Sequence, residues 1–598
     1  MKYVRLGYGS DAKHLARNLR VVSKVVIDNL LDDPQYFILQ AARRIDSKLL
    51  SKAASLSSRF LPHRAPVLRA FCLLLSGNSG QLANHLLQVE PTKVSARTLA
   101  RLGDMALAVQ DAPSAKHLLS AEVAATTPLV RSRARHAWYL GDMHEAVRLL
   151  EGIVGPSNKQ LRHYKSELDV FMGSSPSVNQ VPRGVAYATE KNIALHFLTN
   201  SLPHTGSGYA QRSHSIMMAL RDVGWTAEVL TRSGYPLTVG KISATEIDVV
   251  EDINYRRILP GKYRSDMKSR IQQQADGLAL EVERLKPRVL HTTTDFTNAL
   301  AVMSVARAYG IPWVYEVRGQ LADTWASTRP DAAKNSERYK MFKEREAFVA
   351  SHADLVVTLG EAMKAELVSQ GIAPEKIMLA PNAVGGEYLD TPIERKVARE
   401  ELGLDPELQY VGTVSSLVSY EGLDLLVRAV AELVPHNPRL RLLIVGSGVE
   451  SNNLVTLTQE LGIRDRCIFP GRVPREQARM YHCALNVFVV PRRDLSVTRA
   501  VTPLKPVEAL ACAVPVVAAD LPALRELVQH EETGLLVEPE SVEQLANAIQ
   551  ILVEEPLKSN AMGETGRLKV LEERTWEANA KKLSGSYKSM LGNTALNG

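Results

Sequence analysis

Residues 501–520 read VTPLKPVEALACAVPVVAAD, which predicts a turn, then the beginning of a helix, then a short buried strand. Thr502, Pro503 and Leu504 interrupt regular structure. Pro506 suits the first turn of a helix, because a helix leaves the N–H groups of that turn unpaired. The β-branched run over residues 514–518 is typical of a strand in a parallel sheet. These features indicate an α/β domain.

The same stretch carries two charged residues suited to a nucleotide. A helix start presents free N–H groups and a positive dipole end, which favour a phosphate. Lys505 adds a full positive charge there, and Glu508, one turn later, can accept hydrogen bonds from a ribose diol. We interpret Thr502, Pro503, Leu504, Lys505 and Glu508 as a nucleotide diphosphate site. An ordinary capped helix would explain the same residues.

This segment resembles the donor-site signature of retaining glycosyltransferases of family 4. In that family two glutamates are separated by seven residues and followed by Ala, a small residue and Pro-Val-Val. The second glutamate is matched by Glu508, but alanine stands at the first, Ala500. The stretch is similar to that of an exopolysaccharide-type sub-group with a TPLKPxEA motif. Alanine at position 500 affects how the donor hexose is held, since the first glutamate of the family normally lies near the sugar.

The resemblance implies the GT-B fold, in which two Rossmann-like domains face each other across a cleft. The composition fits such a protein, because 598 residues suggest three or four domains and 45% of them are hydrophobic. The four cysteines show no metal-ligand spacing, and we expect buried free thiols in a reducing cytoplasm (Cys72, Cys467, Cys483, Cys512). The start of the chain lacks the apolar core of a signal peptide, and the sequence contains no membrane-spanning run, so we predict a cytoplasmic protein.

Positive charge is concentrated in the first third of the chain. Residues 1–180 contain 24 Lys and Arg against 14 Asp and Glu, a net charge of +10. The remaining residues contain 48 against 51, a net charge of −3. This asymmetry predicts that the first third of the chain binds an anionic membrane surface, an anionic polymer or a protein partner. A basic face that is merely solvated would give the same asymmetry. Nucleic acid is disfavoured, since no recognised binding motif accompanies the charge.

Apolar residues recur at helical spacing through residues 1–175, which predicts an all-α basic domain. Residues 136–150, HAWYLGDMHEAVRLL, are typical of two helices joined by a Gly-Asp turn. Such pairs resemble tetratricopeptide-type (TPR-like) repeats. Residues 176–190 are polar and rich in proline and glycine, so we predict a linker there.

Strands and helices alternate after the linker, which predicts two parallel sheets. The first set of expected strands covers residues 193–198, 226–230, 288–291, 313–317 and 355–358. The second covers residues 410–414, 441–445, 466–469, 487–490, 514–518 and 534–537. We therefore expect an acceptor-side domain over 191–395, a hinge at 394–404, a donor domain over 396–575, and a final helix, 576–598, that crosses back.

Ligands of open α/β sheets lie beyond the carboxyl ends of the strands. The loop after the first expected strand contains Gly206 and Gly208, which allow close approach of the backbone to the donor. His204 and Arg212 flank this loop, and we expect them to contact phosphate, sugar or acceptor. A surface role would explain either side chain equally well.

Glu316 and Arg318 have the same parity along an expected strand and therefore face the same side. Many relatives have a histidine near the reacting sugar at the position matched by Arg318. A carboxylate beside a guanidinium can position that guanidinium against a hydroxyl or a phosphate. We therefore assign Glu316 and Arg318 catalytic roles together with Lys505 and Glu508. A structural salt bridge is the alternative.

Loops at the ends of the second set of strands supply further donor-binding candidates (Ser415, Gly446, Gly448, Gly471). The family usually places an arginine and a lysine here to neutralise the diphosphate, but Ser415 and Glu421 occupy the matched positions. We expect Arg492 and Arg493 to take over this role with Lys505.

The resemblance implies transfer of a sugar from a nucleotide diphosphate sugar to an acceptor hydroxyl of a glycan, a glycolipid or a cell-surface polysaccharide precursor, with retention of configuration. Cations and amide dipoles would stabilise the leaving diphosphate, so we expect no metal and no other cofactor. A nucleotide-sugar 2-epimerase or a phosphorylase shares this architecture. A non-catalytic scaffold of a glycan pathway is the other alternative, because the first glutamate and the usual basic pair are missing.

Overall fold

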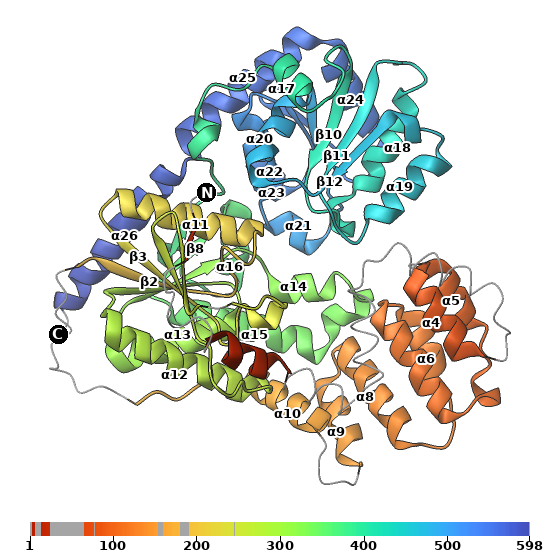
Figure 1. The fold of residues 1–598 in the computed structure, drawn as a ribbon, viewed down its shortest axis with the longest axis vertical. Helices are drawn as coiled ribbons and strands as arrows, with labels where there is room; N and C mark the ends of the chain where they lie inside the picture. The colour runs from red at the N-terminus through yellow and green to blue at the C-terminus, as the bar shows by residue number, and fades with distance from the viewer. Residues whose placement is uncertain are drawn as a thin grey trace.

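The computed structural model describes residues 3–5, 14–23, 65–76, 78–153, 159–179, 191–243 and 245–596. They form three bodies: a helical module, a first sheet domain and a second sheet domain (Figure 1). Residues 180–190 of the predicted linker lie outside the described residues. Within the described part, no helix is both long enough and apolar enough to cross a membrane.

The helical module contains α-helices that pack in consecutive pairs. Ser95 caps α6 and Asp111 caps α7, each by accepting a hydrogen bond from a backbone N–H three residues later. Leucine and alanine side chains between the helices form a core separate from those of the sheet domains. The TPR-like character of these pairs stays a prediction. The elements are α4 (Pro66–Ser76), α5 (Ser79–Leu87), η1 (Pro91–Lys93), α6 (Ala96–Ala108), α7 (Ala112–Leu119), α8 (Thr127–Leu140), α9 (Met143–Glu151) and α10 (Lys159–Phe171).

The first sheet has nine strands in the order β1-β4-β5-β3-β2-β6-β7-β8-β9. All neighbours from β5 to β9 pair in parallel, whereas β4 pairs antiparallel with both β5 and β1. The strands are β1 (Tyr3–Arg5), β2 (Ile193–Leu198), β3 (Thr226–Thr231), β4 (Ile247–Val250), β5 (Ile253–Arg257), β6 (Val289–Thr293), β7 (Trp313–Val317), β8 (Leu355–Thr358) and β9 (Ile377–Leu379). The strand β1 departs from the prediction of an all-α region over 1–175.

Helices cover the sheet and carry the loops of the cleft. They are α11 (Gly208–Asp222), η2 (Leu237–Val239), α12 (Met267–Leu285), α13 (Phe296–Tyr309), α14 (Leu321–Ala326), η3 (Asp331–Asn335), α15 (Glu337–His352), α16 (Glu361–Ser369) and η4 (Pro374–Lys376).

The second sheet contains six parallel strands in the order β12-β11-β10-β13-β14-β15, the 3-2-1-4-5-6 order of a Rossmann sheet. Its strands are β10 (Gln409–Val414), β11 (Leu440–Val445), β12 (Cys467–Gly471), β13 (Val487–Val490), β14 (Val516–Ala519) and β15 (Gly534–Val537). The helices of this domain are η5 (Gly386–Leu389), α17 (Arg395–Glu401), η6 (Ser419–Glu421), α18 (Leu423–Leu433), α19 (Ser451–Glu460), η7 (Arg464–Arg466), α20 (Arg475–Ala484), α21 (Ser496–Ala500), α22 (Lys505–Ala511), α23 (Pro522–Arg525), α24 (Val542–Glu554) and α25 (Pro556–Glu573). The last helix, α26 (Trp576–Leu596), returns to the first domain.

The chain crosses between the sheet domains before the predicted hinge. Most of residues 394–404 forms α17, which packs on α20 of the second domain, so this segment is not a hinge. The two segments that connect the domains meet instead at Val384. Its N–H donates to Arg574 O, and its carbonyl accepts a hydrogen bond from Trp576 N. The following helix α26 packs on α11 of the first domain, as the sequence predicts (Figure 1).

The helical module is fixed to the first sheet domain by an aromatic cluster. Phe171, the last residue of α10, packs edge-on against Phe296 and Phe342, with ring centroids 5.5 and 5.4 Å away. Close to this cluster Gly141 has φ +94°, and a Cβ there would lie 2.3 Å from Ser336 Oγ. The α10 helix therefore belongs to the core of the sheet domain, although the sequence grouped it with the helices before it.

The cysteines are free thiols. Cys467, Cys483 and Cys512 are buried, as the sequence predicts, and Cys72 is partly buried.

Replacing Phe171 by alanine should lower the free energy of unfolding by about 3–5 kcal/mol, because it leaves a cavity between α10 and the sheet domain. Thermal and denaturant unfolding would measure the change. Met172→Ala is the matched control, since the neighbouring Met172 side chain is 63% exposed and should change stability little. Equal effects of the two substitutions would contradict this role of Phe171.

Candidate active site

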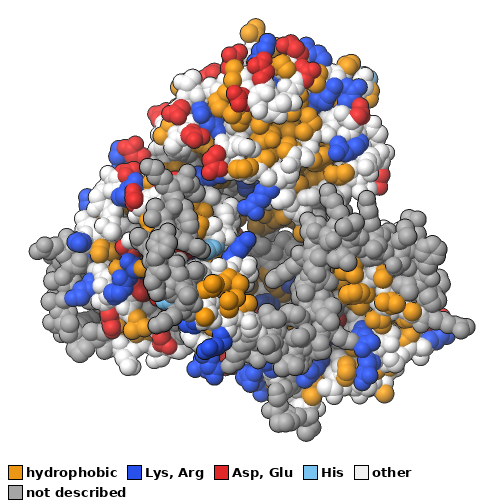
Figure 2. All heavy atoms as spheres, in the orientation of Figure 1, with side chains coloured by type: hydrophobic (Ala, Val, Ile, Leu, Met, Phe, Trp, Pro, Cys, Tyr) orange, Lys and Arg blue, Asp and Glu red, His pale blue; other side chains and the backbone are white. Residues whose placement is uncertain are grey.

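The two sheet domains meet where loops at the carboxyl ends of their strands approach each other. A Cβ added to Gly319, after β7, would lie 3.1 Å from Tyr209 Oη and 3.9 Å from Val501 Cγ2 of the second domain. Asn382 Nδ2 also donates to Thr502 O at 2.8 Å. Figure 2 shows Lys and Arg side chains where the upper and lower lobes approach. The predicted donor turn therefore lies at the meeting point of the domains.

Three polar side chains of this turn make no hydrogen bond and no ion pair with the described residues. Thr502 is buried, and its Oγ1 has no hydrogen-bond partner. Lys505 and Glu508 are half-buried, and among the described residues neither side chain makes a hydrogen bond or an ion pair. Pro503 is buried and Leu504 half-buried beside them. The turn thus presents a hydroxyl, an ammonium and a carboxylate that are all available to a ligand.

The environment of Glu508 disfavours its charge. Burial raises the pKa of the Glu508 carboxyl, and the positive charges of Lys505 and Arg475 partly oppose this rise. Hydrogen-bond donors of a ligand would offset the solvation that the Glu508 carboxylate loses on burial.

Arg492 is buried and held by a carboxylate. Its Nη2 and Nε donate to the two oxygens of Glu421 at 2.8 and 3.1 Å, and its Nη1 donates to Val501 O. Burial alone would raise the pKa of Glu421, but Arg492, and more weakly Lys505, lower it below its usual value. The positive charge of Arg492 is therefore largely neutralised within the protein.

Arg493 is also paired with acidic residues. Its Nη2 donates to Asp424 Oδ2 at 2.6 Å, and its Nη1 lies 3.6 Å from Glu540 Oε2. The sequence predicted that Arg492 and Arg493 replace the family's diphosphate cations. The structure does not support free cations at these positions, because each guanidinium already faces a carboxylate from another loop or helix.

The strand-end glycines of the second domain allow two loops to touch. Gly446 has φ +139°, and a Cβ there would lie 1.8 Å from Ser415 O. A Cβ on Gly448 would lie 2.0 Å from Leu417 O. Gly446 N donates to Gly471 O and Ser415 N to Val445 O. The structure thus brings together the backbones of four predicted donor-site residues (Ser415, Gly446, Gly448, Gly471). Their observed contacts are with other loops of the same domain.

Glu316 is the centre of a buried ion cluster below the cleft. It is 1% exposed, and its carboxylate accepts from Arg318 Nη2 at 2.5 Å and from Arg212 Nε at 2.8 Å. Burial alone would raise the pKa of Glu316, but these two guanidinium groups hold it well below its usual range. The predicted pairing of Glu316 with Arg318 on one face of the strand is confirmed. Both oxygens of Glu316 are occupied, so it positions Arg318 rather than reaching a ligand.

Arg318 retains an unused donor. Its Nη1 donates to Tyr209 O and Ser213 Oγ, whereas its Nε is buried without a hydrogen-bond partner. This N–H group lies on the first domain near the donor turn of the second.

Arg212 does not contact the cleft. It is 3% exposed, and besides Glu316 it donates to Ala380 O, Pro381 O and Asn382 Oδ1. Arg212 uses its guanidinium to fix the crossing between the domains, and its contact with phosphate or sugar stays a prediction.

His204 also has a structural partner. Its Nε2 lies 3.1 Å from Asp248 Oδ2, and Asp248 is bound by Arg257 as well. Burial alone would raise the pKa of Asp248, but His204 and Arg257 together lower it to about 2. His204 thus belongs to a partly buried ion cluster at the edge of the sheet, and its predicted acceptor contact has no support from this geometry.

The described residues contain no group of three or more His, Cys, Asp or Glu side chains that could hold a metal ion. Metal-free transfer stays a prediction.

Residues 207–383 match the family model described as Glycosyl transferase 4-like domain, and residues 394–569 match the one described as Glycosyl transferases group 1. The matches fall on the first and the second sheet domain, respectively, and together cover more than half of the chain.

The two sheet domains are glycosyltransferase domains.

Curated relatives and a solved structure agree with these matches. The chain is 27% identical over 432 residues to D-inositol 3-phosphate glycosyltransferase of Rhodococcus jostii, which is 69% of this chain and 91% of that protein. It is 33% identical over 229 residues to the protein of the same name from Segniliparus rotundus, covering 37% of this chain and about half, 49%, of that relative. Sucrose-phosphate synthase from Thermosynechococcus elongatus superposes with a TM-score of 0.55 at 22% identity, covering 67% of this chain and 99% of that one. The structural likeness supports the fold.

Three side chains that the sequence analysis did not single out lie where the two glycosyltransferase domains approach each other: Tyr209, Arg472 and Arg475. Gly206 and Gly208 lie exposed before and at the start of α11, as predicted. Arg472 Nη2 would lie 3.6 Å from a Cβ on Gly206, and Arg475 donates to the side chain of Gln211 across the cleft. Tyr209 is 49% exposed beside them. Arg472 follows the strand β12, and that strand-end position was the available signal.

Replacing Glu316 by glutamine should destabilise the protein by about 3–5 kcal/mol at neutral pH, because Arg212 and Arg318 would remain buried beside a neutral group. A carboxyl whose folded-state pKa is depressed stabilises the fold above its unfolded pKa of about 4.3. The difference between wild type and variant should therefore shrink as the pH falls from about 4.3 towards the lower folded-state pKa.

Unfolding of both proteins across this pH range would measure the effect. Glu281→Gln, which breaks an exposed pair with Arg284, is the control and should cost less than about 1 kcal/mol. A difference for Glu316→Gln that is independent of pH would contradict the ionised state of Glu316.

Proposed function

We propose that the protein transfers a hexose from a nucleotide diphosphate sugar to an acceptor hydroxyl with retention of anomeric configuration. This proposal rests on the difference between the paired and the unpaired polar side chains of the cleft. Arg492, Arg493 and Glu421 are paired, whereas Thr502, Lys505 and Glu508 have no protein partner among the described residues. Unpaired, half-buried polar groups in a cleft are typical of a ligand site.

The roles of the donor turn follow from its chemistry. The Lys505 ammonium stabilises the negative charge that develops on the departing diphosphate, and no carboxylate of the described residues forms an ion pair with it. Glu508 accepts hydrogen bonds from the ribose hydroxyls of the donor. Thr502 Oγ1 supplies a further hydrogen bond to the phosphate or the sugar.

Arg318 faces the reacting sugar from the opposite domain. Its Nε–H is buried and has no hydrogen-bond partner among the described residues, so a sugar hydroxyl or a phosphate oxygen that reaches it would accept a hydrogen bond, and Glu316 fixes the plane of the guanidinium. Because Glu316 is enclosed by two guanidinium groups, it does not serve as a covalent nucleophile. With Glu316 enclosed and Glu508 assigned to the ribose hydroxyls, we propose that retention proceeds by front-face displacement, in which the departing phosphate takes up the proton of the acceptor hydroxyl.

Closure of the cleft supports transfer over hydrolysis. Contacts between the glycosyltransferase domains, such as Arg475 with Gln211 and Lys334 Nζ with Ser496 Oγ at 3.1 Å, hold the domains together. Excluding water from the cleft leaves the acceptor hydroxyl as the nucleophile.

The acceptor is a polyhydroxylated molecule, such as a glycan, a glycolipid or a cell-surface polysaccharide precursor. The names of the relatives, D-inositol 3-phosphate glycosyltransferases, support an acceptor rich in hydroxyl groups. The TPLKPxEA-like motif supports an exopolysaccharide-type activity. We further propose peripheral association with the inner face of the membrane, because residues 1–180 carry a net charge of +10.

Replacing Lys505 by alanine should lower the turnover number about 10²–10³-fold, because one electrostatic stabiliser of the leaving group is lost. Glu508→Ala should weaken donor binding and turnover without unfolding the protein. Release of nucleotide from UDP-, GDP- and ADP-sugars in the presence of an acceptor panel would measure both. Lys558→Ala, which removes an exposed lysine of α25, is the control.

Wild-type turnover in Lys505→Ala and Glu508→Ala would contradict the assignment. Calorimetry that finds no binding of any nucleotide sugar to the wild type would instead favour a scaffold. Proton NMR of the product tests retention, since the anomeric coupling distinguishes it from inversion.

A further inference from the structure

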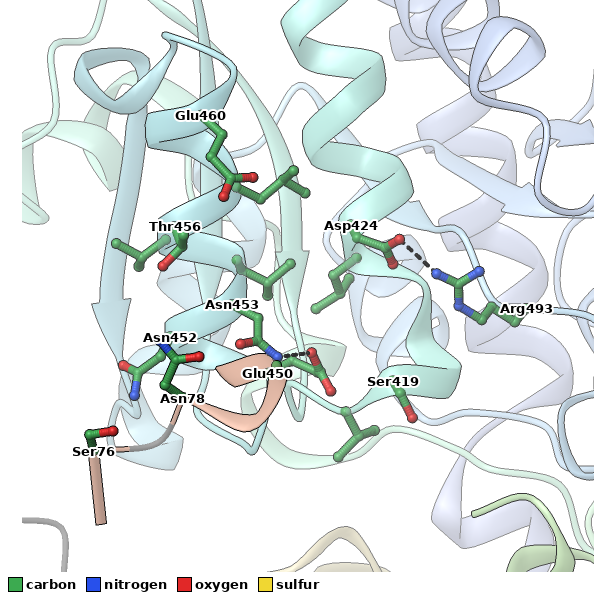
Figure 3. A pocket seen from close by; sticks show the side chains of 16 residues that line it. Ser76, Asn78, Ser419, Asp424, Glu450, Asn452, Asn453, Thr456, Glu460 and Arg493 are labelled. Carbon is green, nitrogen blue, oxygen red and sulfur yellow. Dashed lines mark hydrogen bonds and ion pairs between the residues drawn. The ribbon is translucent and has the colours of Figure 1, made fainter. Parts of the chain in front are cut away.

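A pocket of about 960 Å³, open to solvent along one side and called the cavity below, lies between the helical module and the donor domain. Its walls come from the turn between α4 and α5 on one side and from α18, α19 and the loop after β10 on the other (Figure 3). This volume is at the upper end of the range of about 300–1,000 Å³ for small-molecule sites. The helical module is therefore part of the wall of a site that the glycosyltransferase domains do not form alone.

One face of α19 lines this cavity with polar side chains. Asn452, Thr456 and Glu460 follow each other at intervals of four residues, so they lie on the same face of the helix. All three side chains are exposed to solvent in the open pocket, and within the described part of the chain none of them has a protein hydrogen-bond partner. Figure 3 shows Asn453 beside them, where its Nδ2 donates to Glu450 Oε2 at 2.9 Å. Amide, hydroxyl and carboxylate groups thus point into one space.

The lining also carries negative charge. Asp424, Glu450 and Glu460 contribute three carboxylates against the single guanidinium of Arg493, a net charge of −2. Arg493 is already paired with Asp424. Phosphates, nucleotides and uronic acids are therefore repelled, whereas neutral hydroxyl groups can donate to the carboxylates and accept from the amides. The partly exposed Val418 and Leu457 provide apolar surface for the faces of sugar rings.

The cavity adjoins the donor site at two points of the chain. Ser419 lines the cavity, while Glu421, two residues later, holds Arg492 in the cleft. Arg493 lines the cavity, while its neighbour Arg492 donates to the donor turn at Val501 O. A molecule in the cavity therefore lies next to the place where transfer is proposed.

We propose that this cavity binds an uncharged oligosaccharide, the part of a glycan acceptor that lies behind its reacting end. The proposal rests on the proposed transferase function and adds the class of acceptor. It also gives the helical module a role, because Ser76, Asn78 and Gly80 line the cavity on that side.

Two substitutions test the site from its opposite walls. Glu460→Arg reverses a charge on α19, and Gly80→Trp fills the cavity from α5, where a Cβ meets no atom within 4 Å. Glu564→Arg, on an exposed site of α25, and Gly585→Trp, on α26 where a Cβ also meets no atom, are matched controls. Thermal unfolding would confirm that all four variants fold.

Binding of the full-length protein would be measured by saturation-transfer NMR. The probes are uncharged gluco-, manno- and galacto-oligosaccharides from di- to hexasaccharides, with uronate oligosaccharides of the same lengths. We expect uncharged oligosaccharides to bind, Glu460→Arg and Gly80→Trp to weaken that binding at least about tenfold, and the controls to retain it.

Preference for uronates, binding of no oligosaccharide, or equal binding by Glu460→Arg, Gly80→Trp and wild type would each overturn the proposal. Calorimetry with UDP-, GDP- and ADP-sugars runs in parallel on the same proteins. Failure of nucleotide-sugar binding in the wild type would overturn the transferase function itself. Normal nucleotide-sugar binding with unchanged oligosaccharide binding in Glu460→Arg and Gly80→Trp would overturn only the oligosaccharide site.

Discussion

The buried carboxylate of Glu316 is the interaction on which the arrangement of the cleft depends. It draws Arg212 and Arg318 to one point below the cleft, and each arginine then fixes a different part of the molecule. Arg212 binds the chain at residues 380–382, where it crosses between the domains. Arg318 binds the first turn of α11 through Tyr209 O. The C-terminal helix reaches the same cluster, because Tyr587 Oη lies 2.6 Å from His291 Nδ1 and His291 lies beside Glu316. One desolvated anion therefore connects the sheet, the crossing and the returning helix, and losing it would leave two buried cations without compensation.

Pairing of charges also decides which groups of the cleft remain available. Arg492, Arg493 and Arg212 are basic residues close to the meeting point of the domains, yet each is held by a carboxylate. Lys505 and Glu508 lie a turn apart on α22 without such partners in the described residues. A ligand with both a diphosphate and neighbouring hydroxyl groups matches this pair. The proposed oligosaccharide cavity differs from the donor site in its charge. Its carboxylates outnumber its cations, which favours uncharged molecules over anions.

Much of the fold could be predicted from local sequence. The expected strands at 193–198, 313–317, 355–358, 487–490 and 534–537 coincide with β2, β7, β8, β13 and β15, because short apolar runs bounded by turns carry a strong local signal. The short strands β1, β4, β5 and β9 lack this signal and escaped prediction. The segment 394–404 was misread as a hinge, since charged residues such as those of α17 occur equally in exposed helices and in linkers.

The sequence by itself determined the two Rossmann-like domains, the position of the donor turn and the shared face of Glu316 and Arg318, because each depends on neighbours within a few residues. Only the tertiary structure decided which charges are free. Arg492 meets Glu421 from 71 residues away, and Arg212 meets Glu316 from 104 residues away. The same is true of the cavity between α5 and α19, whose walls come from separate modules. Local patterns record the preferences of the backbone, whereas the charge state and accessibility of a side chain depend on the partners that the packing of distant elements brings to it.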